Sequence, residues 1–326
     1  MKTTTTPTHA DLTEVLAAMR GLLGVGDLRR LFATTNPTRT EMLAACPGLL
    51  DAATAVRHAR DLTAAVKAAT VAEEGFMTVL DRLGNRMAKT PATAAEILEE
   101  AHRLVTAEQT VNQALALATQ LDVRAGSDLS EVVTAGADAM RARLHTLLGD
   151  LVDQARRLDA PATAEDAITT GRTSAYQQFR DLALTYGQLR QAQADLDIAS
   201  AVVTDPRNTH YRLASRITNA ATIFPEVGQW TRYSDGPPNA DGWQTIAPTP
   251  PWPRLDAPAA DWLRYYTTSP DAQPWVPSQA DLHDAMREIG EAGRAARLAD
   301  IPRVLERSKP GDGWRAIAHA ATGGTR

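Results

Sequence analysis

The chain has a single cysteine, Cys46, few aromatic residues and no strong excess of charge of either sign. One thiol can form no internal disulfide, and it excludes the zinc sites built on two or four cysteines. Aromatic residues make up 5% of the 326 residues, and the formal net charge is -5. A chain of this charge does not coat nucleic acid through bulk electrostatics. Because 44% of its residues are hydrophobic, we expect a folded protein with a substantial core.

Long apolar runs are missing as well. No stretch approaches the roughly 18 uncharged apolar residues of a membrane-spanning helix. Residues 1–10 contain no apolar run, so we expect no signal peptide and a disordered tail there. The expected location is the cytoplasm, without a membrane partner. Only four of the 34 basic residues are lysines, and with much alanine this indicates a GC-rich genome such as that of an actinobacterium.

The motifs of several enzyme classes are absent. The chain has no Walker A phosphate loop, no HExxH zinc motif and no GxSxG nucleophile elbow. Glu99 and His102 form one Glu-x-x-His pair on a predicted helix, but a di-iron site needs a second such pair and two more glutamates. We therefore expect no catalytic residue, no metal and no cofactor, although the sequence leaves enzyme activity undecided.

Long amphipathic patterns predict an all-α fold, an elongated bundle of long antiparallel helices. The four long helices are expected over about 49–87, 91–121, 127–158 and 161–203, with Gly126 ending the second. A helix over about 210–224 and two or three C-terminal helices, the first ending near residue 298, are expected to follow. The expected segments are a tail (1–10), a short-helix cap (11–47), the bundle (48–204), a helix with a Trp/Pro-rich irregular strap (205–277) and the C-terminal helices (278–326).

The short helices expected over residues 11–46 allow a helix-turn-helix-like unit. Asp11 and Glu14 resemble a capping box ahead of the first helix. Arg29, Arg30 and Arg39 would be the basic side chains that contact nucleic acid. A nucleic-acid-associated regulator is therefore an alternative function, although a cap on a bundle explains the same pattern.

A coiled-coil-like seam is predicted in the fourth long helix. Leu182, Leu189 and Leu196 lie seven residues apart, and Gln193 and Ser200 interrupt the alternate positions of the seam. Such a seam forms either the core edge of an antiparallel bundle or a contact with a second chain.

The Trp/Pro-rich segment is the most unusual stretch of the chain. Residues 225–277 contain five of the six tryptophans and eleven of the nineteen prolines. A strap whose tryptophans fill grooves between helices is one interpretation. A recognition surface that includes Trp230, Trp243 and Trp252 is the other, because tryptophan is enriched at interface hot spots.

The sequence as a whole favours a non-enzymatic helical interaction or assembly protein that acts through protein–protein contacts. Its partner would be another protein or a second copy, and the candidate contact residues are those of the seam and the three tryptophans. An enzyme with a pocket between bundle and strap is a further alternative, and it would need convergent polar groups in that pocket.

Overall fold

The structure is a computed structural model, and it describes residues 27–32, 36–72, 94–218, 220–228, 230, 249–269 and 272–307. The described residues form eleven helices that pack against one another, and they contain no strand. The all-α prediction is therefore confirmed for this part of the chain. None of the helices described is long and apolar enough to cross a membrane.

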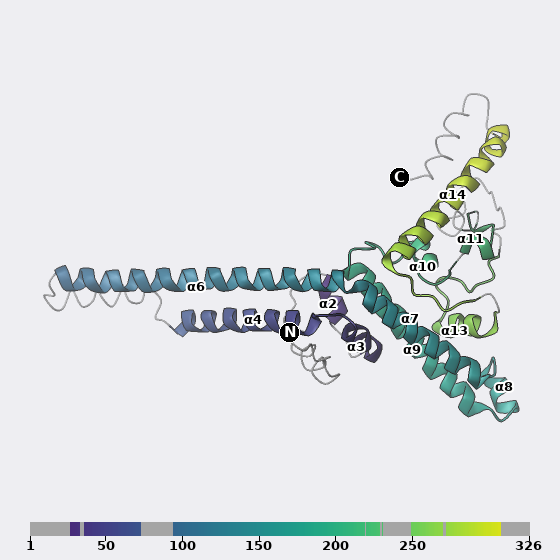
Figure 1. Ribbon diagram of the computed structural model, residues 1–326, viewed down its shortest axis with the longest axis horizontal. Helices are drawn as coiled ribbons and strands as arrows, with labels where there is room; N and C mark the ends of the chain where they lie inside the picture. The colour runs from purple at the N-terminus through teal and green to yellow at the C-terminus, as the bar shows by residue number, and fades with distance from the viewer. Residues whose placement is uncertain are drawn as a thin grey trace, which may run out of the picture. The chain divides into compact units, whose positions relative to one another are not determined.

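The chain divides into two compact units, which Figure 1 shows without fixing their relative positions. Unit 1 comprises Met1–Thr34 and Cys46–Ala135, and unit 2 comprises Thr35–Ala45 and Gly136–Arg326. The long helices are thereby separated into two pairs, one in each unit. The units follow packing, whereas the five segments expected above follow composition.

Unit 1 is built on an antiparallel pair of helices, α4 (Leu49–Ala72) and α6 (Ala94–Ala135), with the short α2 (Asp27–Phe32). The Arg60 Nε donates to Asp122 Oδ1 at 3.0 Å, and the Thr63 hydroxyl lies 3.3 Å from the carbonyl of Ala118. Residue numbers that rise on α4 thus fall on α6. Near the start of α4 the core of the unit is aliphatic and includes Leu49, Val56, Leu129 and Val133.

The helix α6 passes through Gly126, so the helix end predicted there is wrong. A glycine inside a helix costs only about 1 kcal/mol relative to alanine. Asp122 before it and Leu129 after it both contribute to unit 1, the first through its ion pair and the second through burial. The break falls at Gly136, the N-cap of α7 (Ala137–Leu158). The continuation of α4 that the sequence predicts over 73–87 lies outside the described residues.

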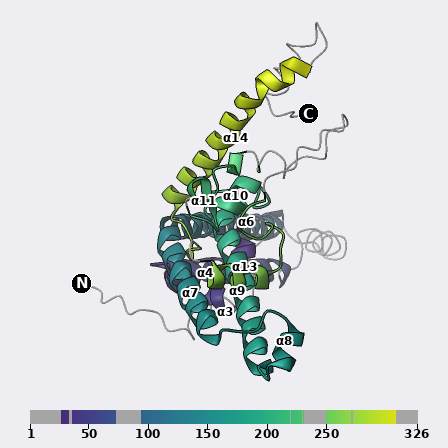
Figure 2. The same ribbon diagram turned by 90° about the vertical axis from the view of Figure 1, so that its right-hand side faces the viewer.

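Unit 2 is built on the helices α7 and α9 (Thr173–Ala199), which lie side by side in Figures 1 and 2. The helix α3 (Pro37–Ala44), although it comes from the N-terminal part of the chain, packs on both. Asn36 caps α3, since its side chain accepts from the Thr38 N–H. The buried side chains of Met42 and Leu43 anchor α3 in the unit.

Three helices expected in unit 2 have different bounds in the structure. The helix expected over 161–203 is divided into α8 (Ala164–Thr169) and α9, and Gly171 between them has a φ of 67°, which favours glycine. The helix expected over 210–224 is divided into α10 (Thr209–Ala214) and α11 (Ala220–Ile223). The last described helix, α14, spans Gln279–Arg307 and does not end near residue 298.

The described part of the Trp/Pro-rich segment is held to the helices by hydrogen bonds from arginine and tryptophan. This part contains α13 (Ala259–Thr268). The Trp275 Nε1 donates to the carbonyl of Ala214 at 2.7 Å, and the Arg216 guanidinium donates to the carbonyl of Leu255 at 3.0 Å. The same guanidinium lies over the ring of Trp262, 4.8 Å from its centroid. Backbone carbonyls without a helical partner are thus satisfied by side chains.

Cys46 provides a probe of unit 1, because it is the single cysteine of the chain. Its side chain is buried, and burial raises the pKa of the thiol to about 11. At pH 8 the folded chain should therefore react with a thiol reagent about two-hundredfold more slowly than the unfolded chain, whose thiol has a pKa near 8.5. Labelling rates in buffer and in denaturant would measure this, and equal rates would contradict the burial of Cys46.

The same shift makes the stability of unit 1 depend on pH. An unfolded thiol loses its proton near pH 8.5, whereas the folded thiol keeps it until about pH 11. Between these values the unfolded chain binds fewer protons, so the contribution of Cys46 to stability falls as the pH rises through this window. Replacing Cys46 with alanine should remove that contribution to the pH dependence.

Candidate functional site

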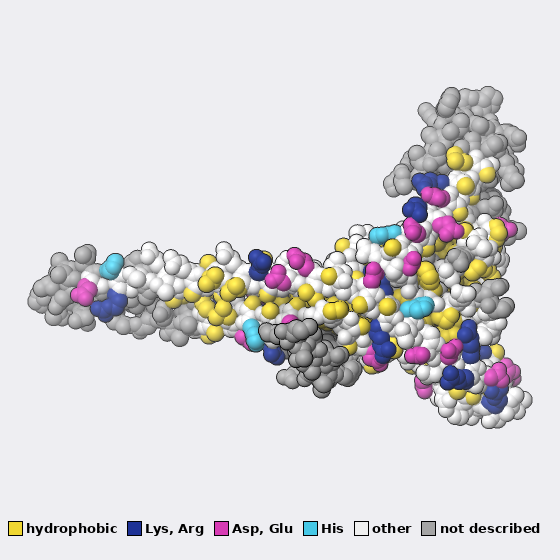
Figure 3. All heavy atoms as spheres, viewed as in Figure 1, with side chains coloured by type: hydrophobic (Ala, Val, Ile, Leu, Met, Phe, Trp, Pro, Cys, Tyr) yellow, Lys and Arg dark blue, Asp and Glu magenta, His cyan; other side chains and the backbone are white. Residues whose placement is uncertain are grey.

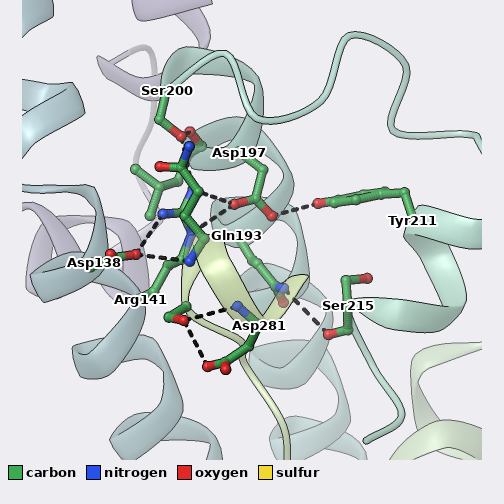
Figure 4. A network of polar contacts seen from close by, with 11 residues as sticks. Asp138, Arg141, Gln193, Asp197, Ser200, Tyr211, Ser215 and Asp281 are labelled. Atoms are coloured by element: carbon green, nitrogen blue, oxygen red, sulfur yellow. Dashed lines mark hydrogen bonds and ion pairs between the residues drawn. The ribbon is translucent and has the colours of Figure 1, made fainter. Parts of the chain in front are cut away.

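A buried network of polar side chains joins α7, α9 and α10 in unit 2 (Figure 4). The Arg141 Nε donates to Asp197 Oδ1 at 2.9 Å, and both side chains are 1% exposed. The Tyr211 hydroxyl donates to the other carboxylate oxygen of Asp197 at 2.8 Å. A further nitrogen of Arg141 donates at 2.9 Å to the Ser200 hydroxyl, which itself donates to the carbonyl of Leu196. These contacts connect three helices through one ion pair.

Burial determines the electrostatics of this network. It raises the pKa of the Asp197 carboxyl, while the Arg141 guanidinium and the Tyr211 hydroxyl act in the opposite direction. Burial and the neighbouring Asp197 raise the pKa of Tyr211. Because water is excluded, each charge of the pair depends on the other for its compensation.

Asp138 extends the network to the start of α14. One oxygen of its carboxylate accepts from Arg141 at 3.0 Å and from the backbone N–H of Gln279 at 2.9 Å. The Gln279 N–H lowers the pKa of Asp138. Ser278 lies directly before α14, and its hydroxyl accepts from the Asp281 N–H and donates to the Asp281 carboxylate. The first turns of α7 and α14 are therefore linked through one carboxylate.

A second polar cluster surrounds Arg190 on α9. Its guanidinium donates to five oxygens, at 2.7 Å to 3.1 Å: Tyr186 Oη, Gln193 Oε1, the Ser215 carbonyl, the Trp275 carbonyl and Tyr266 Oη. Gln193 also donates to the carbonyl of Ser215 at 3.3 Å. Arg190 thus connects α9 to the end of α10 and to the Trp/Pro-rich segment.

Within the described residues, the contacts of Arg141, Asp197, Tyr211 and Ser200 hold the helices of unit 2 together. The charged atoms of Arg141 and Asp197 are used in contacts with each other and with neighbouring side chains. In the part of the chain that the structure describes, no group of three or more His, Cys, Asp or Glu residues could hold a metal ion. Glu99 and His102 lie on α6 with exposed side chains.

The seam residues predicted to bind a partner lie largely inside unit 2. Leu189 and Leu196 are 0% exposed, and Leu182 is partly exposed. In this conformation a partner at the surface contacts neither Leu189 nor Leu196. The two polar interruptions of the seam, Gln193 and Ser200, belong to the two buried clusters. These two interruptions of the apolar pattern are the sequence signal for the buried clusters, which no catalytic or metal motif marks.

The tryptophans predicted to bind a partner are also buried where the structure describes them. Trp230 and Trp252 are buried, and their rings meet edge to face with centroids 5.8 Å apart. Phe224 packs on Trp252 in the same way, at 5.4 Å. Trp243 lies outside the described residues. The two described candidates therefore contribute to an aromatic core.

Arg30 and Arg39, two of the basic residues predicted to contact nucleic acid, differ in exposure and belong to different units. The Arg39 side chain is buried and forms an ion pair with Asp195 of α9. Arg30 is exposed on α2, which belongs to unit 1, whereas Arg39 belongs to unit 2. The side chain of Arg29 lies outside the described residues. The buried guanidinium of Arg39 is used to attach α3 rather than exposed to a phosphate.

An exposed apolar surface lies on unit 1. Leu62 of α4 is 44% exposed, and Leu117 and Leu121 of α6 are 57% and 43% exposed. Leu62, Leu117 and Leu121 directly precede Thr63, Ala118 and Asp122, which contact the other helix. Because the two helices are antiparallel, residues one position before the contact positions lie on the same side of the pair. Figure 3 shows hydrophobic side chains gathered over α4 and α6 on the face drawn there. We call Leu62, Leu117 and Leu121 the leucine flank.

Comparisons with family models, with curated proteins and with solved structures find no significant match to this chain.

Proposed function

We propose that the chain is a non-enzymatic assembly protein that associates with a second copy of itself through the leucine flank. The observation that supports this proposal is the exposure of three leucines on one side of the α4–α6 pair. Contiguous exposed apolar side chains are typical of protein–protein contacts.

The distribution of side-chain sizes in unit 1 supports the same conclusion. Between α4 and α6, at the level of the flank, lie the small residues Ala59 and Ala118 and the ion pair of Arg60 with Asp122. Larger leucines lie outside this seam rather than within it. A helix pair normally buries its largest apolar side chains, so this arrangement favours a further layer over the flank.

A second copy fits this surface for two reasons. Most soluble oligomers are symmetric, and two antiparallel pairs packed face to face form a four-helix arrangement without further components. The charges beside the leucines are of both signs, with Arg124 and Asp128 on α6 in an exposed pair at 3.6 Å. Two copies of such a surface can face each other without net repulsion.

Replacing Leu121 with lysine should weaken this self-association. About half of the side chain is left to bury, which corresponds to roughly 1 kcal/mol at each of the two copies of the site. A loss of about 2 kcal/mol raises the dimer dissociation constant by roughly thirtyfold. Sedimentation equilibrium over a concentration series would measure the change.

Val123→Lys is the matched control for this substitution. Val123 is on the same helix and is 69% exposed, but the helical period places it on the opposite side of the α4–α6 pair. The control should associate like the wild-type chain. Equal dissociation constants for all three proteins would remove the leucine flank from the proposal.

A further inference from the structure

Two arginine side chains near the end of α10 converge on one backbone carbonyl of unit 2. Arg212 lies in the last turn of α10, and Arg216 follows it by four residues, just beyond the helix. The guanidinium groups of both donate to the carbonyl oxygen of Leu255, that of Arg216 at 3.0 Å. Two donors that share an acceptor lie within about 6 Å of each other, because a hydrogen bond spans about 3 Å. Two positive charges are therefore held close together.

The acidic side chain beside this pair does not neutralise it. Among the described residues, neither Arg212 nor Arg216 is part of an ion pair. Asp256 follows Leu255 in the chain, but its carboxylate forms an exposed ion pair with Arg254 at 3.2 Å. The hydrogen bond from Arg254 lowers the pKa of Asp256, and Arg212 makes a smaller contribution in the same direction. The charge of Asp256 is thus matched by Arg254, and the two converging arginines carry an excess of positive charge.

A third arginine adds to this excess. Burial lowers the pKa of Arg216, and the positive charges of Arg190 and Arg212 act in the same direction, whereas Tyr186 and Tyr266 oppose them. The acceptors around Arg190 are hydroxyl, amide and carbonyl oxygens, and none of these five is a carboxylate. Positive charges that are partly removed from water are stabilised most by an anion that also accepts their hydrogen bonds.

The two guanidinium groups are positioned to bind such an anion. That of Arg216 lies over the buried ring of Trp262, 4.8 Å from its centroid, which fixes its plane and leaves its N–H edge for acceptors. A guanidinium has five N–H donors. The contact with Leu255 uses one nitrogen of each group, and the other nitrogens form no hydrogen bond with the residues that the structure describes. Arg212 and Arg216 are both partly exposed, so a small ligand reaches them from solvent.

We propose that Arg212 and Arg216 bind a phosphate group, either as free inorganic phosphate or as the phosphate of a small monoester. A phosphate dianion matches the two positive charges, and its several oxygens accept from both guanidinium groups at once. The site lies in unit 2, so the inference goes beyond assembly through the leucine flank, and its test does not depend on that surface.

Calorimetric titration of the intact chain with inorganic phosphate, at an ionic strength held constant with chloride, tests the site. Arg212→Met should raise the dissociation constant about tenfold, because it removes a charge-assisted hydrogen bond. Arg207→Met is the matched control, since it removes the same charge from an exposed arginine just before α10, and it should bind like the wild-type chain. Equal dissociation constants for Arg212→Met and the wild-type chain would overturn the site.

Glycerol phosphate in place of inorganic phosphate distinguishes the two sources of the group. Binding of both supports a site for phosphate monoesters, and binding of inorganic phosphate alone supports a site for the free ion. Binding of neither would overturn the proposal.

Protection from phenylglyoxal, which modifies guanidinium groups, gives a readout that needs no substitution. Inorganic phosphate at ten times its dissociation constant fills about nine-tenths of the sites, so it should slow the modification of Arg212 roughly tenfold. The modification of Arg207, measured in the same sample by mass spectrometry of peptides, should keep its rate. Equal slowing at the two arginines, or no slowing at Arg212, would contradict a phosphate site at the end of α10.

Discussion

Replacing Asp197 with alanine should lower the free energy of unfolding of unit 2 by about 3–5 kcal/mol, since this is the cost of leaving one partner of a buried ion pair uncompensated. The Arg141 guanidinium would remain in a site where it is 1% exposed, and the Tyr211 hydroxyl would lose its acceptor. Denaturation in urea followed by tryptophan fluorescence measures this change, because all six tryptophans belong to unit 2.

Two further variants separate the buried pair from charge effects in general. Asp153→Ala removes the carboxylate of an exposed pair with Arg156, and it should change the stability by no more than about 1 kcal/mol. Arg141→Met combined with Asp197→Leu removes both buried charges, and it should recover much of the loss of the single substitution. If Asp197→Ala lowers the stability as little as Asp153→Ala does, the buried pair of Arg141 and Asp197 does not stabilise unit 2 in the way proposed.

Replacing Gly228 with alanine should destabilise unit 2 by about 3 kcal/mol, at the upper end of the usual cost of overpacking. A Cβ atom at this position would lie 2.2 Å from the carbonyl oxygen of Ala292 and 2.5 Å from its carbon. Both atoms belong to the backbone of α14, so no side-chain rotation relieves the overlap. The residue and the helix would have to move apart, and urea denaturation would detect the loss.

Gly149→Ala is the matched control for Gly228→Ala. Gly149 lies inside α7, and a Cβ atom there would meet nothing within 4 Å. The substitution should stabilise the helix by up to about 1 kcal/mol, because alanine has the higher helix propensity. If Gly228→Ala and Gly149→Ala lower the stability by the same amount, the close approach of Gly228 to α14 is not the cause of the loss.

The helical fold was predictable from the sequence because amphipathic periodicity is a local property of the chain. The helix ends were less predictable, because pairing in unit 1 outweighs the cost of Gly126. At Gly171 the positive φ requires a residue that tolerates it, and the sequence carries that signal. The residues on both sides of Gly171 form helices, and their helical pattern led to the wrong expectation of one continuous helix.

The polar clusters were less predictable because their contacts join residues far apart in the chain. Arg141 and Asp197 are separated by 56 residues, and Arg39 and Asp195 by 156. No spacing rule connects such positions before the helices are packed. Gln193 and Ser200 were visible as interruptions of an apolar seam, which is the local trace that a buried polar network leaves.

The exposure of the leucine flank was not predictable from the sequence, for a different reason. Leu62, Leu117 and Leu121 follow the apolar pattern of a helix, and the pattern alone places them toward a core. Their exposure becomes visible only when the contacts of Thr63 with Ala118 define which side faces the partner helix.

The mass of the intact chain by light scattering, followed across a hundredfold range of concentration, tests the central claim most directly. We predict a mass that rises from the 35.1 kDa of one chain toward twice that value, with the rise shifted to higher concentration by Leu121→Lys. A mass of the intact chain that stays at 35.1 kDa across the range would contradict assembly through the leucine flank.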